Sequence, residues 1–343
     1  MKIRLQFKLV ARTLLYIHCA ALVTFVFLFH PGINNYEKAM FGDMIQGKAY
    51  RPYVYRVLVP YTVRFVDSKM PQTAKVFLRT SLNNPRLAFK LGWEAENTFA
   101  YFTVTLIIFL SFLAFAFTLR GLTLHFYPDS DLFADFAPAV GLLVLPSLFR
   151  YSNHIYDPAT LLLTGCAILY LARRHPLPYY LFFVLAVANK ETAILLVPFF
   201  VIAFRGTMAT SKIALRVGLQ ILIFATIRGA IFYAYSANPG DPVEFHLSGN
   251  VSLLQEPGVV FYLIVLYVVA GYLVGKNWND KHPLLRFGVL AVLVPLVLLS
   301  VFFGNLDEPR AYYEAYPFVF LLSLHTIIVQ WKAPGTPVSR TPG

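Results

Sequence analysis

Apolar runs long enough to cross a lipid bilayer recur along almost the whole chain. In a bilayer such a run is stable as a helix, because a helix satisfies its own backbone hydrogen bonds. Of the 343 residues 58% are hydrophobic and 13% are charged, which excludes a water-soluble fold. The runs lie at residues 11–29, 98–119, 135–149, 158–172, 177–188, 192–204, 213–235, 257–275, 284–303 and 315–331. The sequence therefore predicts an all-α, polytopic integral membrane protein with about ten transmembrane helices.

One of these apolar stretches, residues 177–204, is interrupted by Asn189, Lys190 and Glu191. A single helix would bury a Lys-Glu pair near the bilayer centre, where each charge costs about 3 kcal/mol. Two short helices would instead place the triplet in a turn at the membrane surface. Only the two-helix topology gives every cytoplasmic connection Lys or Arg residues, as the positive-inside rule requires. We therefore predict two helices here and both termini on the cytoplasmic side.

The ends of the chain and its charge lead to three further predictions. The basic residues before the first run, with no small-residue cleavage site after Phe29, predict a retained signal anchor. Cys19 and Cys166 lie in apolar runs and are predicted to be packing residues. The net charge of +12 comes from residues that flank the runs, so we expect membrane lipids and no nucleic acid as partners. Residues 1–332 are predicted to form one transmembrane domain and residues 333–343 a disordered tail.

The predicted topology places five polar segments on the same, outer face: residues 30–97, 150–157, 189–191, 236–256 and 304–314. The long first loop, 30–97, contains two segments with amphipathic spacing, 53–65 and 73–91. We predict interfacial helices there, with Lys and Arg side chains at the lipid headgroups. The five segments can converge on one site.

Candidate acid and base residues occur in the first two of these segments. Glu37 or Asp43 could act as a general base, with a pKa tuned by Lys38 or Arg56; the alternative is a solvated loop acid. Asp157 precedes Pro158, which is also the pattern of a helix N-cap. Capping does not explain why Arg150 and His154 crowd the same short connection, where the three side chains suit acid/base or phosphate chemistry.

Candidate phosphate-binding residues come from the later segments. Lys190 and Glu191 either bind substrate or pair with each other. Arg228 lies inside an apolar run and should face a polar cavity, where it would bind an anion or form a structural ion pair. Glu308, Arg310 and Tyr312 lie in the last outer loop, where mixed charges suit sugar hydroxyls and phosphate oxygens as well as ordinary loop chemistry.

The order and spacing of these features resemble those of the GT-C superfamily of membrane glycosyltransferases, in the branch of the protein mannosyltransferases and lipid A aminoarabinose transferases. The resemblance covers residues 1–205 loosely: a basic N-terminus with one span, then Tyr36, Gly47, Pro52 and Pro60 in a long loop, Asp157 opening a helix, and the turn in NKETAILLVP. The family's first-loop acid normally lies about four residues before the position of Tyr36, where this chain has His30-Pro31-Gly32-Ile33. Either Glu37 or Asp43 substitutes, or the chemistry is altered or lost.

The resemblance implies an enzyme that moves a sugar from a polyprenyl-phosphate carrier to a lipid, glycan or protein acceptor, outside the cytoplasmic membrane of a bacterium. Asp43 or Glu37 would be the base, and Asp157 would orient the acceptor or bind a divalent metal. Lys190, Arg228 and Arg310 would carry the phosphate charge, and Tyr53, Tyr55 and Tyr312 would stack on the sugar. Arg56, Arg150, His154, Glu191 and Glu308 complete the expected substrate site.

Two other classes of protein remain. A polysaccharide polymerase or ligase would also use an outer-face site with arginines, but is typical of chains with a larger late outer loop than residues 236–256. A transporter would be expected to show inverted repeats and helices broken at the midplane.

Overall fold

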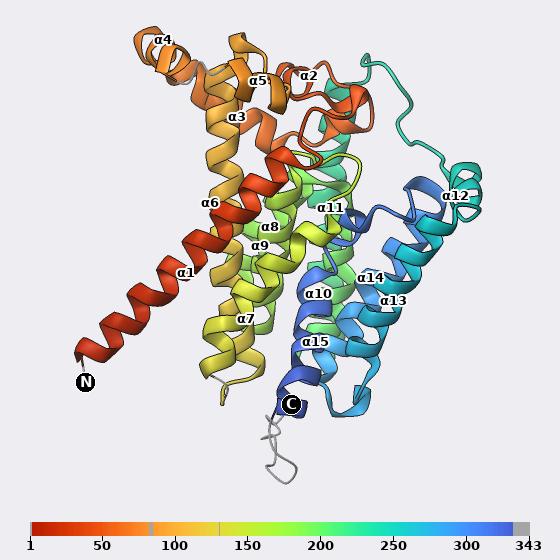
Figure 1. Cartoon of the computed structure of the whole chain (residues 1–343). Helices are drawn as coiled ribbons and strands as arrows, with labels where there is room; N and C mark the ends of the chain where they lie inside the picture. The colour runs from red at the N-terminus through yellow and green to blue at the C-terminus, as the bar shows by residue number, and fades with distance from the viewer. Residues whose placement is uncertain (1, 82–84, 130, 332–343) are drawn as a thin grey trace.

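The computed structural model describes residues 2–81, 85–129 and 131–331, and every regular element in this part of the chain is helical (Figure 1). Six helices are long and apolar enough to cross a membrane, so the chain is a polytopic membrane protein by length and composition. They belong to α1 (Lys2–Phe29), α6 (Thr98–Phe126), α7 (Asp131–Val144, extended by a 3-10 turn), α11 (Thr210–Ala234), α13 (Pro257–Gly275) and α14 (Pro283–Phe303). The predicted count of about ten includes four shorter apolar helices.

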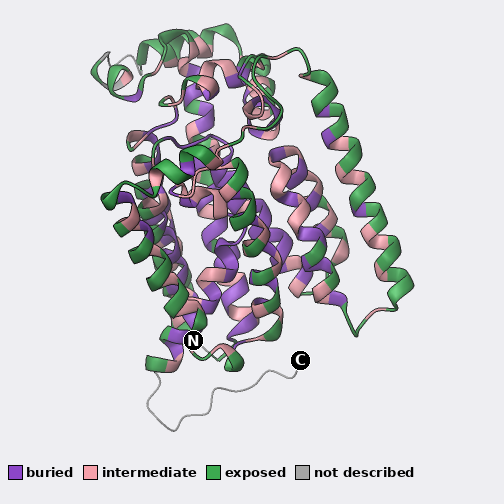
Figure 2. Ribbon diagram, turned by 90° about the vertical axis from the view of Figure 1, so that its right-hand side faces the viewer, coloured by how far each residue is buried: buried purple, intermediate pink, exposed green. Residues whose placement is uncertain are grey.

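These four shorter helices are α8 (Asp157–Ala172), α9 (Pro176–Asn189), α10 (Leu196–Phe204) and α15 (Tyr316–Trp331). Helix α8 is buried almost all round, and Figure 2 shows that buried residues gather in the middle of the bundle. Close approach requires small residues there. A Cβ atom on Gly165 of α8 would lie 3.1 Å from the Phe115 ring of α6, and one on Gly288 of α14 would lie 2.5 Å from the ring of Phe318 on α15.

The stretch 177–204 forms two helices, as predicted. Helix α9 ends at Asn189, Lys190 is extended, and a 3-10 turn over Glu191–Leu195 leads into α10. The rings of Tyr179 and Phe200, on opposite sides of the turn, stack with their centroids 5.7 Å apart. The two helices therefore run antiparallel, and the charged triplet lies at their tip.

The five polar segments meet at one end of the bundle, which we call the loop-bearing end (top of Figure 1). Backbone hydrogen bonds join the segments there: Arg51 N donates to Pro239 O, Val57 N to Ala188 O and Asn153 N to Gly32 O. The predicted convergence is confirmed. Both described ends of the chain lie at the opposite end of the bundle.

Short helices form the rest of the loop-bearing end: α2 (Phe41–Gln46), α3 (Leu58–Lys69), α4 (Gln72–Ser81), α5 (Pro85–Leu91) and α12 (Leu247–Leu253). The predicted amphipathic segments 53–65 and 73–91 are thus helical for most of their length, with a 3-10 turn over Tyr53–Tyr55 before α3. Helix α4 buries no residue in the protein. A membrane surface is the environment that suits such a helix.

At the opposite end, α1 is fixed by its polar side chains. Asp135 of α7 accepts hydrogen bonds from Arg12 of α1 at 2.9 Å and from Arg120 of α6 at 3.0 Å. Cys19 and Cys166 are free and buried, which confirms them as packing residues. The predicted disordered tail, 333–343, lies outside the described residues.

Candidate functional site

A cavity of about 950 Å³ lies at the loop-bearing end, among the first loop, the α9–α10 tip, α11, α12, α14 and the loop before α15. Its lining includes apolar side chains such as Phe232, Leu296 and Phe303. The same lining is rich in charge. Its acidic and basic side chains, with one histidine, are Arg56, Lys190, Glu191, Arg228, Glu244, His246, Asp307, Glu308 and Arg310.

Glu191 holds two arginines on this wall. Its Oε1 accepts a hydrogen bond from Arg56 Nη2 at 2.6 Å, and its Oε2 lies 3.5 Å from Arg228 Nη2. Both guanidinium side chains are buried, at 9% and 3% exposure, whereas Glu191 is 37% exposed. Burial raises the pKa of Glu191, but the charges of Arg56 and Arg228 outweigh it and lower the pKa to about 2. Glu191 is therefore an ionised bridge.

Arg228 faces the bundle interior, as expected for a charge inside a span. Its Nη1 also donates to the carbonyl of Tyr55 at 3.0 Å, and its guanidinium lies over the ring of Phe232. Arg228 thus forms the structural ion pair that was one alternative and also lines the cavity. Arg56 donates in addition to the hydroxyl of Tyr156 at 3.2 Å.

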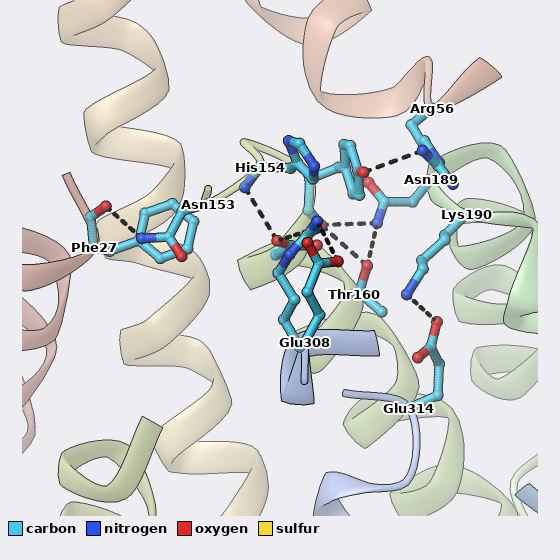
Figure 3. A network of polar contacts seen from close by, with 12 residues as sticks. Phe27, Arg56, Asn153, His154, Thr160, Asn189, Lys190, Glu308 and Glu314 are labelled. Atoms are coloured by element: carbon cyan, nitrogen blue, oxygen red, sulfur yellow. Dashed lines mark hydrogen bonds and ion pairs between the residues drawn. The ribbon is translucent and has the colours of Figure 1, made fainter. Parts of the chain in front are cut away.

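The sequence left open whether Lys190 and Glu191 bind substrate or pair with each other. In the structure Lys190 does not pair with Glu191. The backbone leaves Lys190 extended, so the two side chains diverge. Lys190 Nζ instead lies 3.0 Å from Glu314 Oε1, and Thr192 donates to the same carboxylate oxygen. The tip of the α9–α10 hairpin is thereby tied to the segment before α15 (Figure 3).

Asp157 begins α8, but it is not the N-cap that its position before Pro158 predicts. Its carboxylate makes no capping bond to the first turn of α8; Oδ2 accepts from the backbone N–H of His154 at 3.1 Å and lies 3.6 Å from Arg310 Nη1. Arg310 also pairs with Glu308 at 3.0 Å. Burial raises the pKa of Asp157, and the charges of Arg310 and Lys190 offset part of this rise.

His154 lies behind the cavity wall. It is 2% exposed, and its ring stacks on Tyr156 with centroids 5.2 Å apart. Burial and the nearby charges of Arg310 and Arg56 lower the pKa of the imidazole well below its usual value. The ring is therefore neutral at pH 7.

Asparagine side chains fix the backbone around these groups (Figure 3). The amide of Asn153 donates to Phe27 O at 2.7 Å and so ties the second loop to the end of α1. The amide of Asn189 donates to Tyr156 O at 3.0 Å and to Thr160 Oγ1 at 2.9 Å, which joins the ends of α9 and α8. Asp157 and the Lys190 tip are thus positioned by one polar network.

Glu244 is a cavity residue that the sequence did not single out. It lies between α11 and α12, and its carboxylate accepts from Lys38, accepts from the hydroxyl of Tyr53 at 3.1 Å and lies 3.4 Å from His246 Nε2. Tyr53 and Glu244 are 191 positions apart, so no local pattern joins them. The only sequence feature that pointed to Glu244 was the presence of three acids in residues 236–256.

Six predicted site residues do not line this cavity: His154 and Asp157 lie behind its wall, and the other four lie elsewhere. Glu37 is exposed, and Asp43 lies in α2, where its backbone carbonyl accepts from the N–H groups of Lys48 and Ala49. Arg150 is 3.4 Å from Asp307 and so is drawn away from Asp157; Tyr312 hydrogen-bonds Tyr267 at 3.4 Å. Apart from these four, the structure brings the predicted site residues together, with Arg56, Lys190, Glu191, Arg228, Glu308, Arg310 and Tyr55 on the wall and His154 and Asp157 behind it.

The acids do not form a metal centre. Among residues 2–81, 85–129 and 131–331, no group of three or more His, Cys, Asp or Glu side chains could hold a metal ion. Asp157, considered above for a divalent metal, faces the guanidinium of Arg310 instead. The arrangement is a set of cation–carboxylate pairs around a cavity.

Comparison with protein-family models, with curated proteins and with solved structures finds no match to this chain.

Proposed function

We propose that the protein is a membrane glycosyltransferase that moves a sugar from a polyprenyl-phosphate carrier to an acceptor. The observation that carries the proposal is the lining of the cavity, which combines four Lys and Arg side chains with apolar helix residues. A lipid-linked anion has the same two parts. Its phosphate would meet the cations, and its isoprenoid chain would lie along apolar residues such as Leu296 and Phe303.

The cations of the cavity are of the type that binds phosphate. Arg56, Lys190, Arg228 and Arg310 all line it, and Lys and Arg form charge-assisted hydrogen bonds with phosphate oxygens. Arg310 and Lys190 are the most suitable phosphate ligands, because ion pairs hold both of them beside the cavity. Arg310 Nη1 lies 3.6 Å from Asp157 Oδ2, and Lys190 Nζ lies 3.0 Å from Glu314 Oε1.

The base in this proposal is Glu244, in place of Glu37 or Asp43. Glu244 lines the cavity with His246, whereas neither first-loop acid does. Burial raises the pKa of Glu244, but the hydrogen bond and charge of Lys38 outweigh it, so the carboxylate is ionised at neutral pH and can accept a proton. The acceptor O–H would give its proton to this site, its oxygen would bond to the anomeric carbon, and the sugar–phosphate bond would break with its electron pair remaining on polyprenyl phosphate.

The finer topology belongs to the same proposal. Ten crossings, with both termini in the cytoplasm, would place the cavity on the outer face of a bacterial cytoplasmic membrane. The alternation of the helices along the chain in Figure 1 is compatible with this arrangement. Lipid-linked sugars presented on that face would then enter the cavity from the outer leaflet.

The test is turnover of purified protein in nanodiscs with a panel of polyprenyl-phosphate sugars, followed by release of the lipid phosphate. We expect Glu244→Gln to lower turnover by about 10²-fold or more, while Glu256→Gln, an exposed acid outside the cavity, leaves turnover unchanged. Uptake of a solute without any lipid-phosphate sugar would overturn the proposal in favour of a transporter. Release that requires a growing glycan acceptor would identify a polymerase or ligase.

A further inference from the structure

A second cavity, of about 650 Å³, lies at the loop-bearing end on the side of α6. It is formed by α2, α3, α4 and the first residues of α6, and it shares no lining residue with the cavity of the candidate site. Four cations line it, Lys48, Arg64, Lys75 and Arg79, against two acids, Asp67 and Glu96. We call it the basic pocket.

The carboxylates of the pocket do not neutralise all of its positive charge. Lys75 is paired with Asp67 at 2.8 Å, and Arg64 donates only to the neutral hydroxyl of Tyr235, at 3.4 Å. Arg64 has no acidic partner within 4.0 Å among the described residues, and Arg79 is exposed. The pocket therefore has a net positive charge that no carboxylate in its wall neutralises.

The position of the pocket indicates where its ligand comes from. Its wall includes Asn97, Thr98 and Phe99, and the apolar span Ala95–Phe126 begins there. The end of a span is the level at which lipid phosphates lie. The pocket thus opens in the headgroup region.

The helices around the pocket also expose apolar side chains. Tyr61 and Phe65 of α3 are 63% and 54% exposed, and Phe77 of α4 is 66% exposed. In Figure 1, α4 projects beyond the bundle beside the end of α6, and none of its residues is buried. Exposed aromatic rings next to basic residues are typical of helices that lie in the membrane interface.

We propose that the basic pocket binds the phosphate of an anionic phospholipid and so docks α3 and α4 on the membrane surface. Arg64 and Arg79 would hold the phosphate, and the exposed rings of Phe65 and Phe77 would insert among the lipid chains. This site is independent of the proposed transferase activity, because its residues are separate from those of the catalytic cavity.

The test is lipid binding to the detergent-purified protein, measured by native mass spectrometry with phosphatidylglycerol and phosphatidylcholine of identical acyl chains. We expect phosphatidylglycerol to bind about tenfold more tightly, because Arg64 and Arg79 would attract its net negative charge, which phosphatidylcholine lacks. The double variant Arg64→Gln/Arg79→Gln should lose this preference. Arg64→Lys/Arg79→Lys, which keeps the charge, should retain most of it and shows that the fold is intact.

The matched control is Lys69→Gln/Lys90→Gln, which removes the same charge from α3 and α5 outside the pocket. This control should bind phosphatidylglycerol like the unmodified protein. Equal losses in the two glutamine double variants would show diffuse surface attraction and overturn the proposal. Displacement of the lipid by equimolar glycerol phosphate would also overturn it, because the pocket would then bind a free phosphate compound.

Discussion

Replacing Glu191 by Gln tests whether one carboxylate holds the charged wall of the candidate site together. Glu191 is bound to Arg56 at 2.6 Å and lies 3.5 Å from Arg228, and both guanidinium groups are buried. Gln keeps the shape of the side chain but removes its charge. Two cations would then remain close together without the acid that joins them, so we expect a loss of stability.

The magnitude follows from the burial of the three groups. Removing one partner of a fully buried ion pair costs about 3–5 kcal/mol, because the remaining charge is left unpaired. Glu191 is 37% exposed to the cavity, so water can solvate part of the arginine charge, and we expect about 3 kcal/mol. Arg228→Gln in the Glu191→Gln background should restore about 1 kcal/mol or more, because it removes one of the two unpaired cations.

The assay is the free energy of unfolding in micelles, followed by helical circular dichroism. Glu256→Gln is the control; its side chain is exposed, and a change within about 0.5 kcal/mol is expected. A loss below about 1 kcal/mol for Glu191→Gln, or no recovery in the double variant, would refute the reasoning. The arginines would then be held by their contacts with carbonyls and rings, and the carboxylate would be dispensable.

Four further outcomes are expected. Asp157→Asn should lower turnover, because it removes a charge that holds Arg310 beside the cavity, and should leave the protein folded, because Arg310 keeps its ion pair with Glu308; unchanged turnover would make the Asp157–Arg310 pair structural. Lys281→Met should cost about 3 kcal/mol in unfolding free energy, because Lys281 Nζ lies 2.7–2.9 Å from three carbonyl oxygens and Thr326 Oγ1, and its three N–H groups join α13 to α15. A Cys at exposed Ser236 should react with an impermeant reagent added outside cells and one at Thr210 should not; the reverse pattern would invert the topology. The pKa of Glu191 in the folded protein is about 2, below the ordinary 4.5, so Glu191 stabilises the protein above pH 4.5 and this contribution disappears as the pH falls toward 2. The unfolding free energy of Glu191→Gln should therefore fall less than that of the unmodified protein between pH 4.5 and 2.

The charge pattern along the sequence determined the topology around residues 177–204. The positive-inside rule depends only on the order of apolar runs and basic residues, so it identified the α9–α10 hairpin and the loops that share an end with Lys190. The same rule placed residues 30–97 and 236–256 on one face, where they could converge, and the hydrogen bond from Arg51 N to Pro239 O joins them. An apolar run is a short-range feature, so the sequence alone identifies it.

The pairing of charges was decided by the tertiary structure. Lys190 pairs with Glu314 and not with Glu191, because the extended backbone at Lys190 separates the neighbouring side chains. Glu244 reaches the first loop through Tyr53, across 191 positions, while Glu37 and Asp43 in that loop lie off the cavity wall. A side chain's partner depends on the rotation of its helix and the path of its loop, and neither is fixed by the spacing of residues along the chain.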